Sequence, residues 1–174
     1  VPDMLEELWE ERPEVPVTPV TTLDVDSFGG TQRCEKLEWL RKWMMLNDVD
    51  SVLLSSLDEI AWMLNVRGAD IDYNPLVISY LLVTFDSVKW YVRRGDGGMD
   101  PDTEDSFAEL ADEGVEIEEY IGICQALEML AEYGQMSKIF IDPSSLNYHI
   151  YTTICETFAE DSVVMGTSPV ILEK

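Results

Sequence analysis

The stretch SSLDEIAWMLNVRGADIDYNPLVISYLLVT, residues 55–84, contains the strongest local structural signals in the chain. Its first part predicts a helix that begins with a capping box, in which Ser56 and Glu59 satisfy each other's backbone amides. Its last part, residues 76–83, carries no charge and is rich in β-branched and aromatic side chains, so we expect a central buried strand there. Residues 65–75 lie between the two elements and are predicted to form a loop.

Helices and strands alternate on both sides of this stretch. Apolar spacing predicts a helix over residues 31–46, with Lys36 on its solvent side, and a short buried strand over residues 52–54. A short turn leads from the strand at 76–83 to a predicted strand at 88–92, and the two would form a hairpin. Further strands are expected at residues 115–120, 138–142 and 162–165, and further helices at residues 122–133 and 146–158. We therefore predict an α/β fold in which helices flank a mixed β-sheet of about five to six strands.

The first thirty residues differ in composition from the rest of the chain. Pro13, Pro16 and Pro19 alternate with valines, which enforces an extended path. We therefore predict an interdomain connector over residues 1–30 and a folded domain over residues 31–170. A chain that begins with a connector is expected to be part of a larger protein.

The acidic balance excludes several kinds of partner. The chain has 11 Lys+Arg against 35 Asp+Glu, a formal charge of -24, and such a chain repels phosphate backbones, so nucleic acid is not expected as a partner. No charge-free stretch approaches the roughly 18 to 20 residues that span a bilayer, so we expect no membrane partner. The three cysteines Cys34, Cys124 and Cys155 do not fit a disulfide framework. We expect reduced, buried thiols and a cytoplasmic location.

The sequence offers no constellation of residues for catalysis or metal binding. His149 is the single histidine and lies in a predicted helix, where a structural role is expected and pH sensing is the alternative. The eleven acids of residues 96–119 fail the EF-hand pattern, because Asp105 stands where glycine is needed and Ala111 where the bidentate Glu is needed. We expect a solvated, mobile acidic flap there. No nucleophile elbow or phosphate loop is present either, so we assign no catalytic residue, metal ligand or cofactor to this chain.

Charged and conformationally special residues gather in the loop at residues 65–75. Two interpretations stay open for Arg67 and Asp70: an internal salt bridge that shapes the loop, or a carboxylate-binding group for a ligand or a partner domain. A loop held between a capped helix and a buried strand is typical of contact sites. We therefore predict an interdomain or substrate-access site at Arg67, Gly68, Asp70, Tyr73, Asn74 and Pro75.

The stretch at residues 55–84 resembles a segment of the three-domain, cytosolic-type Xaa-Pro aminopeptidases (aminopeptidase P). In that family a Leu-Asp-Glu-Ile-Ala-Trp helix leads through an Asn-x-Arg-Gly-x-Asp loop and an Asn-Pro pair to an apolar strand. The segment LEELWEERPEVPVTPV at residues 5–20 is similar to the linker that enters the family's second domain. The resemblance covers residues 1–92 well, and beyond them only the order of strands and helices agrees.

The resemblance implies the second of two creatinase/prolidase-type N-terminal domains, which precede a C-terminal "pita-bread" catalytic domain in this family. There, two Asp, one His and two Glu bind a dinuclear metal centre, commonly manganese, that hydrolyses the bond before a penultimate proline. None of these ligands can be carried over to this chain, so the catalytic domain is expected to be absent from it. The implied partners are the catalytic domain and the first N-terminal domain of the same enzyme, with a homodimer as a further option.

Two functions from different classes follow, with an enzyme as a third. The first is a non-catalytic domain of an Xaa-Pro aminopeptidase-like metallopeptidase, which serves structure, active-site access and assembly. The alternative is a free-standing acidic protein-interaction module that kept the fold without peptidase activity. An enzyme with its own site would require activity from these 174 residues alone, which we predict to be inactive. A reading frame that continues past Lys174 into Asp, His and Glu motifs would distinguish the first from the second.

Overall fold

The computed structural model describes residues 11, 13, 15–28, 30–94, 100–133 and 138–174. In chain order the elements are β1 (Thr21–Thr22), α1 (Val25–Phe28), α2 (Arg33–Leu46), β2 (Ser51–Leu54), α3 (Leu57–Leu64), β3 (Val66–Arg67), β4 (Ser79–Thr84), β5 (Val88–Val92), α4 (Pro101–Asp112), β6 (Val115–Glu119), η1 (Tyr120–Gly122), α5 (Ile123–Tyr133), β7 (Ile139–Ile141), α6 (Tyr148–Thr157), η2 (Glu160–Ser162), β8 (Val163–Met165) and α7 (Val170–Glu173). Among the described residues, no helix combines the length and apolar character needed to cross a bilayer.

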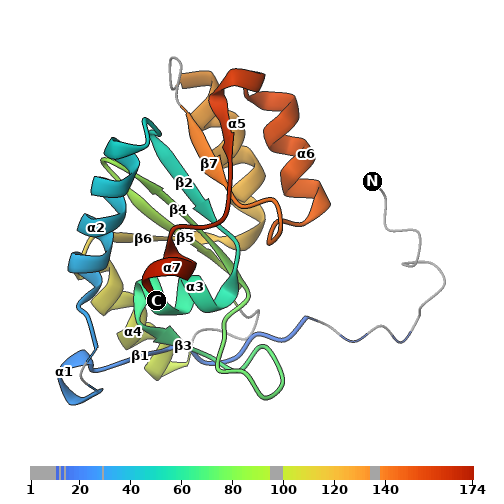
Figure 1. Cartoon of the computed structure of the whole chain (residues 1–174). Coiled ribbons are helices and arrows are strands. Elements are labelled where there is room, and N and C mark those ends of the chain that lie inside the picture. Colours follow the sequence, from blue (N-terminus) through green and yellow to red (C-terminus); the bar gives the residue numbers. More distant parts are fainter. Residues whose placement is uncertain (1–10, 12, 14, 29, 95–99, 134–137) are drawn as a thin grey trace.

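Six strands form a mixed sheet in the order β6-β5-β4-β2-β7-β8 (Figure 1). Strand β4 is antiparallel to both its neighbours, β2 and β5, whereas the pairs β5–β6, β2–β7 and β7–β8 are parallel. The predicted mixed α/β fold and the predicted β4–β5 hairpin are therefore confirmed. Because five of the strands run in one direction, their carboxyl ends meet at one edge of the sheet. The loop that enters β4 lies at this same edge.

The sheet is buried on both faces by helices. Helices α2, α3 and α4 cover one face, and α5 and α6 cover the other (Figure 1). Successive strand residues alternate between the two layers, so that in β2 Val52 and Leu54 join the first cluster and Leu53 joins the second. This explains why the strands are almost continuously apolar, since an exposed face would demand alternate polar residues.

The acidic segment predicted to be a flap, residues 96–119, is ordered wherever the structure describes it. Residues 95–99 lie outside the described part, and the rest forms α4 and β6. The side chain of Asp100 caps α4 by accepting from the amide of the second helical residue, and Pro101 occupies the first position. Phe107 turns inward and packs edge-to-face on a sheet tryptophan, with ring centroids 5.7 Å apart. Over residues 101–112 the expected flap is instead an amphipathic helix whose acids lie on its exposed face, whereas the strand predicted over residues 115–120 is confirmed as β6.

The capping box predicted for α3 is also wrong, although the helix itself is confirmed. Ser56 is the N-cap residue, but its hydroxyl donates to Asp58 Oδ1 at 2.7 Å. Glu59 is buried, and its Oε2 accepts from the hydroxyl of Ser168 at 2.5 Å. Ser168, which is distant in the sequence, therefore binds the Glu59 carboxylate that the local pattern had assigned to the N-cap of α3. A capping box is present instead at the start of α2.

Two assignments of residues to surface or core are reversed in the structure. Lys36, expected on the solvent side of α2, is only 3% exposed. Cys34 and Cys155, expected in the core, are exposed, and Cys124 is intermediate. In the part of the chain that the structure describes, the three thiols are free. Helical spacing alone failed here because buried backbone carbonyls create a site for the lysine, as described below.

The packing of α4 predicts a large effect of truncating its buried leucine. Leu110 is fully buried against the sheet, so Leu110→Ala should lower the free energy of unfolding by about 2–5 kcal/mol through lost burial and a residual cavity. Denaturant unfolding of the two proteins measures this change. Met129→Ala, at a position that is 51% exposed, is the matched control and should have little effect. Equal stability of the Leu110→Ala variant and the parent would mean that α4 does not pack on the sheet.

Candidate functional site

The predicted loop begins where α3 ends, at the carboxyl edge of the sheet. Asn65 ends the helix in the left-handed region, with φ 54° and ψ 40°, and turns the chain into β3, which pairs with β1 of the N-terminal segment. The chain then folds back on itself. The amide of Asp70 donates to the carbonyl of Leu76 at 3.1 Å, and that of Gly68 donates to the carbonyl of Pro75 at 3.5 Å. Main-chain hydrogen bonds therefore close the loop.

Asp70 ties this loop to two other segments. Its Oδ1 accepts from the amide of Thr18 at 2.9 Å and from the Thr18 hydroxyl at 2.7 Å, and its Oδ2 accepts from the amide of Ile78 at 2.8 Å. The Thr18 hydroxyl in turn accepts from the amide of Ala69 at 2.7 Å. One buried carboxylate thus joins the N-terminal segment, the loop and the approach to β4. Loss of this carboxylate would leave buried amide and hydroxyl donors without an acceptor. This destabilises the fold more than removing both partners of a hydrogen bond does.

Arg67 does not take the role expected from its spacing to Asp70. Its Nη1 donates to the carbonyl of Ala61 at 3.1 Å and to that of Val66 at 2.7 Å. Within the described residues, Arg67 and Asp70 form no ion pair. The expected internal salt bridge is therefore wrong, and each side chain instead holds backbone groups.

Gly68 is required because the side chains of Val77 and Thr18 pack closely against its Cα. A Cβ atom at this position would lie 2.6 Å from Cγ2 of Val77 and 3.4 Å from the hydroxyl oxygen of Thr18. The glycine is therefore a packing requirement of the loop.

The tip of the loop presents an aromatic side chain to solvent. Tyr73 is fully exposed and has a φ of 64°, a conformation that is unusual for a residue with a side chain. The amide of Asn74 donates to the carbonyl of Ile71 at 3.1 Å and closes a tight turn around the tyrosine, and Pro75 follows it, also exposed. The loop therefore holds Tyr73 outward on a backbone that is already closed.

Three cations converge on the C-terminus of α3, directly before the loop. Arg33 Nε donates to the carbonyl of Leu64 at 2.7 Å. Lys36 Nζ donates to the carbonyl of Trp62 at 2.5 Å, and Arg67 Nη1 donates to that of Ala61 at 3.1 Å. The last carbonyls of a helix have no partner within the helix, and they carry the negative end of its dipole. Cations are therefore favoured at this position, and we call these three side chains the α3 cation cap.

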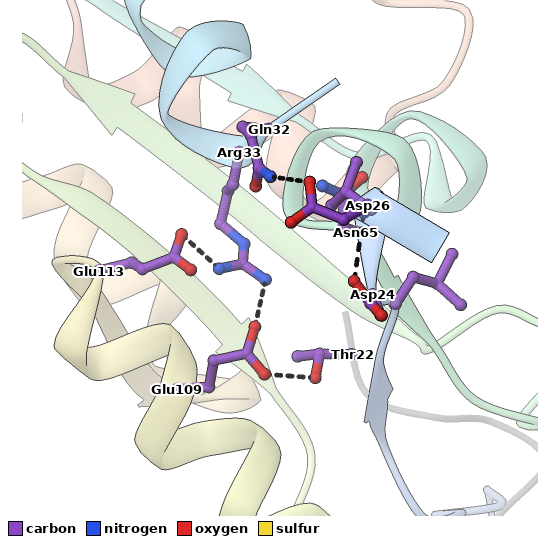
Figure 2. Close-up of a pocket in the computed structure, with 10 residues that line it drawn as sticks. Thr22, Asp24, Asp26, Gln32, Arg33, Asn65, Glu109 and Glu113 are labelled. Atoms are coloured by element: carbon purple, nitrogen blue, oxygen red, sulfur yellow. Dashed lines mark hydrogen bonds and ion pairs between the residues drawn. The ribbon is translucent and has the colours of Figure 1, made fainter. Parts of the chain in front are cut away.

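A polar cavity of about 370 Å³ adjoins the cap and the start of the loop. Figure 2 shows Arg33 reaching from α2 toward Glu109 of α4 and toward Glu113, which directly follows α4. Arg33 is 3% exposed, and its Nη2 and Nη1 lie 3.3 Å from Glu109 Oε1 and 2.5 Å from Glu113 Oε2. This group of residues was not predicted from the sequence. The available signal was that Arg33 shares a helical face with the apolar residues Leu37 and Leu40.

The other wall of the cavity is the N-terminal segment. The Thr22 hydroxyl donates to Glu109 Oε2 at 2.6 Å, and the side-chain amide of Gln32 donates to Asp26 Oδ1 at 3.2 Å (Figure 2). Among the described residues, no group of three or more His, Cys, Asp or Glu side chains is arranged to hold a metal ion. The cavity is therefore lined by ion pairs and hydrogen bonds that hold β1 and α1 against α2 and α4.

Lys36 has an unusual environment within the α3 cation cap. Its Nζ also donates to Asn65 Oδ1 at 2.5 Å and lies 4.4 Å from the centre of the Trp62 ring. Burial, with smaller contributions from the charges of Arg33 and Arg67, lowers the pKa of Lys36 to about 8. Burial disfavours the charged form of an amine, and neighbouring cations add to the effect.

This lowered pKa predicts a rise of stability in alkaline solution. Between pH 8 and the ordinary lysine pKa of 10.5, the unfolded chain binds more protons at Lys36 than the folded chain, so the free energy of unfolding increases with pH. We expect the difference between the parent and Lys36→Met to increase by about 1–3 kcal/mol over this range in the parent's favour. Denaturant titrations at several pH values measure it. Parallel pH profiles for the two proteins would contradict the assignment.

The sequence of the chain matches a known domain family along nearly its whole length. The match is to the family described as the creatinase/prolidase N-terminal domain, over residues 11–174. Aminopeptidase P2 of Arabidopsis thaliana is 30% identical over 163 residues, which cover 91% of this chain and 22% of that protein. Xaa-Pro aminopeptidase 1 of Dictyostelium discoideum is 35% identical over 136 residues, which cover 78% of this chain and 20% of that protein. The chain therefore spans about a fifth of the length of these relatives.

Solved structures agree with the sequence match. A crystal structure of the X-prolyl aminopeptidase of Caenorhabditis elegans, described as a cytosolic enzyme with a di-nuclear active site, superposes with a TM-score of 0.81 and 28% identity. It covers 99% of this chain and 27% of that one. An aminopeptidase P structure from Streptococcus thermophilus, at 12% identity and a TM-score of 0.54, shows the same fold and covers 81% of this chain and 96% of that one. The match over residues 11–174 and the shared architecture confirm the resemblance, and the chain belongs to the creatinase/prolidase N-terminal domain family.

Proposed function

We propose that this chain is a non-catalytic domain of an Xaa-Pro aminopeptidase-like metallopeptidase, an enzyme that removes an N-terminal residue preceding proline. Its role there is to support the structure, to control access to the active site and to contribute to assembly. The named relatives support this proposal, because they are aminopeptidases of which the chain covers only a part. We do not favour the alternative of a free-standing acidic interaction module, because the similarity to these peptidases extends over nearly the whole chain.

The loop at residues 65–75 is the proposed contact site, and one observation carries this: an exposed tyrosine stands on a closed and anchored backbone. Tyrosine offers a large contact area with few rotatable bonds, and a preordered loop loses little entropy on binding. In this proposal the tip of the loop contacts the catalytic domain or lines the route by which the substrate reaches the active site. The tip consists of Tyr73, Asn74 and Pro75. Arg67, Gly68 and Asp70 act as positioning residues that hold the loop.

The remaining parts of the proposal concern the rest of the enzyme. Its partners are the C-terminal catalytic domain and the first N-terminal domain of the same protein, with a homodimer as a further level of assembly. The catalytic domain would supply a dinuclear metal centre, commonly manganese, in line with the di-nuclear active site named for the nematode relative. We place the enzyme in the cytoplasm, because that relative is described as cytosolic.

The isolated chain should not hydrolyse Xaa-Pro peptides, with or without manganese. Such hydrolysis requires a metal-activated water, and the described residues contain no cluster that could hold the metal. Release of the N-terminal residue from a short Xaa-Pro peptide, followed by chromatography, measures this. A longer relative that contains its catalytic domain serves as the positive control. Turnover that copurifies with the 174-residue chain, whether manganese is present or absent, would overturn the proposal.

Tyr73→Ala separates a contact role of the loop from a structural one. Because the side chain is fully exposed, the substitution should change the free energy of unfolding of the isolated chain by no more than about 0.5 kcal/mol. In a full-length enzyme that contains this domain, we expect kcat/KM or the association constant of the assembly to fall by about tenfold, equivalent to ~1.4 kcal/mol. Leu46→Ala, at an 80% exposed residue that precedes β2, is the matched control. Full activity and assembly of the Tyr73→Ala enzyme would remove the loop from the proposed contact.

A further inference from the structure

Helices α5 and α6 bring the single histidine of the chain against one of its three cysteines. Cys124 Sγ lies 3.5 Å from His149 Nε2, which is hydrogen-bond distance for sulfur, and the hydroxyl of Thr153 lies 3.9 Å from the same sulfur. Cys124 is half-buried and His149 is exposed, so a small reagent has access to the pair. The two residues are 25 positions apart, and the packing of α5 on α6 creates the contact.

This arrangement contains the parts of an activated nucleophile. The reactive form of cysteine is the thiolate, and a base within hydrogen-bond reach assists by taking the thiol proton. A neutral imidazole whose proton is on Nδ1 leaves Nε2 free to accept it.

The other two cysteines provide internal controls. Cys34 is exposed and lies in the first turn of α2, and the only histidine in the sequence lies elsewhere. Cys155 is exposed and lies in the last turn of α6, beside Glu156. If exposure alone set the rate of reaction, both would react faster than Cys124. A faster Cys124 would therefore report on His149.

We propose that Cys124 is a nucleophilic modification site of this domain, activated by His149, and that it takes uncharged soft electrophiles such as α-haloamides. In the reaction His149 Nε2 accepts the thiol proton and Sγ attacks the methylene carbon of the reagent. The S–C bond forms as the carbon–halogen bond breaks, the halide leaves with its electron pair, and the proton passes from His149 to solvent. A formal charge of -24 repels anionic reagents, which is why the site selects uncharged ones.

The test is competition among the three cysteines of the complete 174-residue chain. The native protein is treated with limiting iodoacetamide at neutral pH, and mass spectrometry of the peptides gives the extent of alkylation at each cysteine. We expect Cys124 to react first. In His149→Gln, which keeps a polar side chain but removes the base, alkylation of Cys124 should slow by at least about tenfold, while Cys34 and Cys155 stay within about twofold of the parent.

Two controls complete the design. Tyr151→Phe alters α6 one turn before Cys155 and should leave the rate at Cys124 unchanged, so that a loss seen in both variants would indicate a general disturbance of the helix and overturn the assignment. In guanidinium chloride the preference for Cys124 should disappear, because the contact with His149 depends on the fold. A preference that persists there, an unchanged rate in His149→Gln, or rates that follow exposure would each overturn the proposal.

Discussion

The contacts at the C-terminus of α3 are the interaction on which the rest of the site depends. Three of the eleven cations of a strongly acidic chain donate to the last carbonyls of this one helix. They satisfy groups that a helix cannot pair internally, and they lie at the negative end of its dipole. Arg33 also pairs with Glu109 of α4 and with Glu113 directly after it, so the same group joins α2, α3 and α4 on one face of the sheet. The loop that follows α3 starts from this fixed point.

The loop is held at its other end by a carboxylate rather than by cations. Asp70 binds the backbone of the N-terminal segment and the amide that precedes β4. Part of the segment expected to be a connector therefore packs on the domain through β1, β3 and the cavity beside Arg33. A contact made by Tyr73 would consequently be sensitive to the N-terminal segment, which gives a physical basis for coupling between neighbouring domains in the proposed enzyme.

Local patterns predicted most of the fold and the place of the candidate site. The uncharged strand, the hairpin and the apolar faces of α2, α5 and α6 were all visible, because the periodicity of side chains follows directly from helix and strand geometry. Helix α4 was missed because its acids dominated the composition, although Asp100-Pro101 is a helix start signal followed by inward-facing residues at helical spacing. The capping box failed because Ser168, more than one hundred positions away, competes for Glu59.

The sequence by itself determined the fold class, the order of the elements, the family resemblance and the position of the loop, since each depends on neighbours within a few turns of chain. Only the tertiary structure decided which charged groups are buried and what they meet. Lys36 lies inward because folding brings unpaired carbonyls to it, and Cys124 meets His149 because two helices pack side by side. The energy of such groups depends on partners distant in the sequence and on the water that packing excludes, neither of which is encoded in a local pattern.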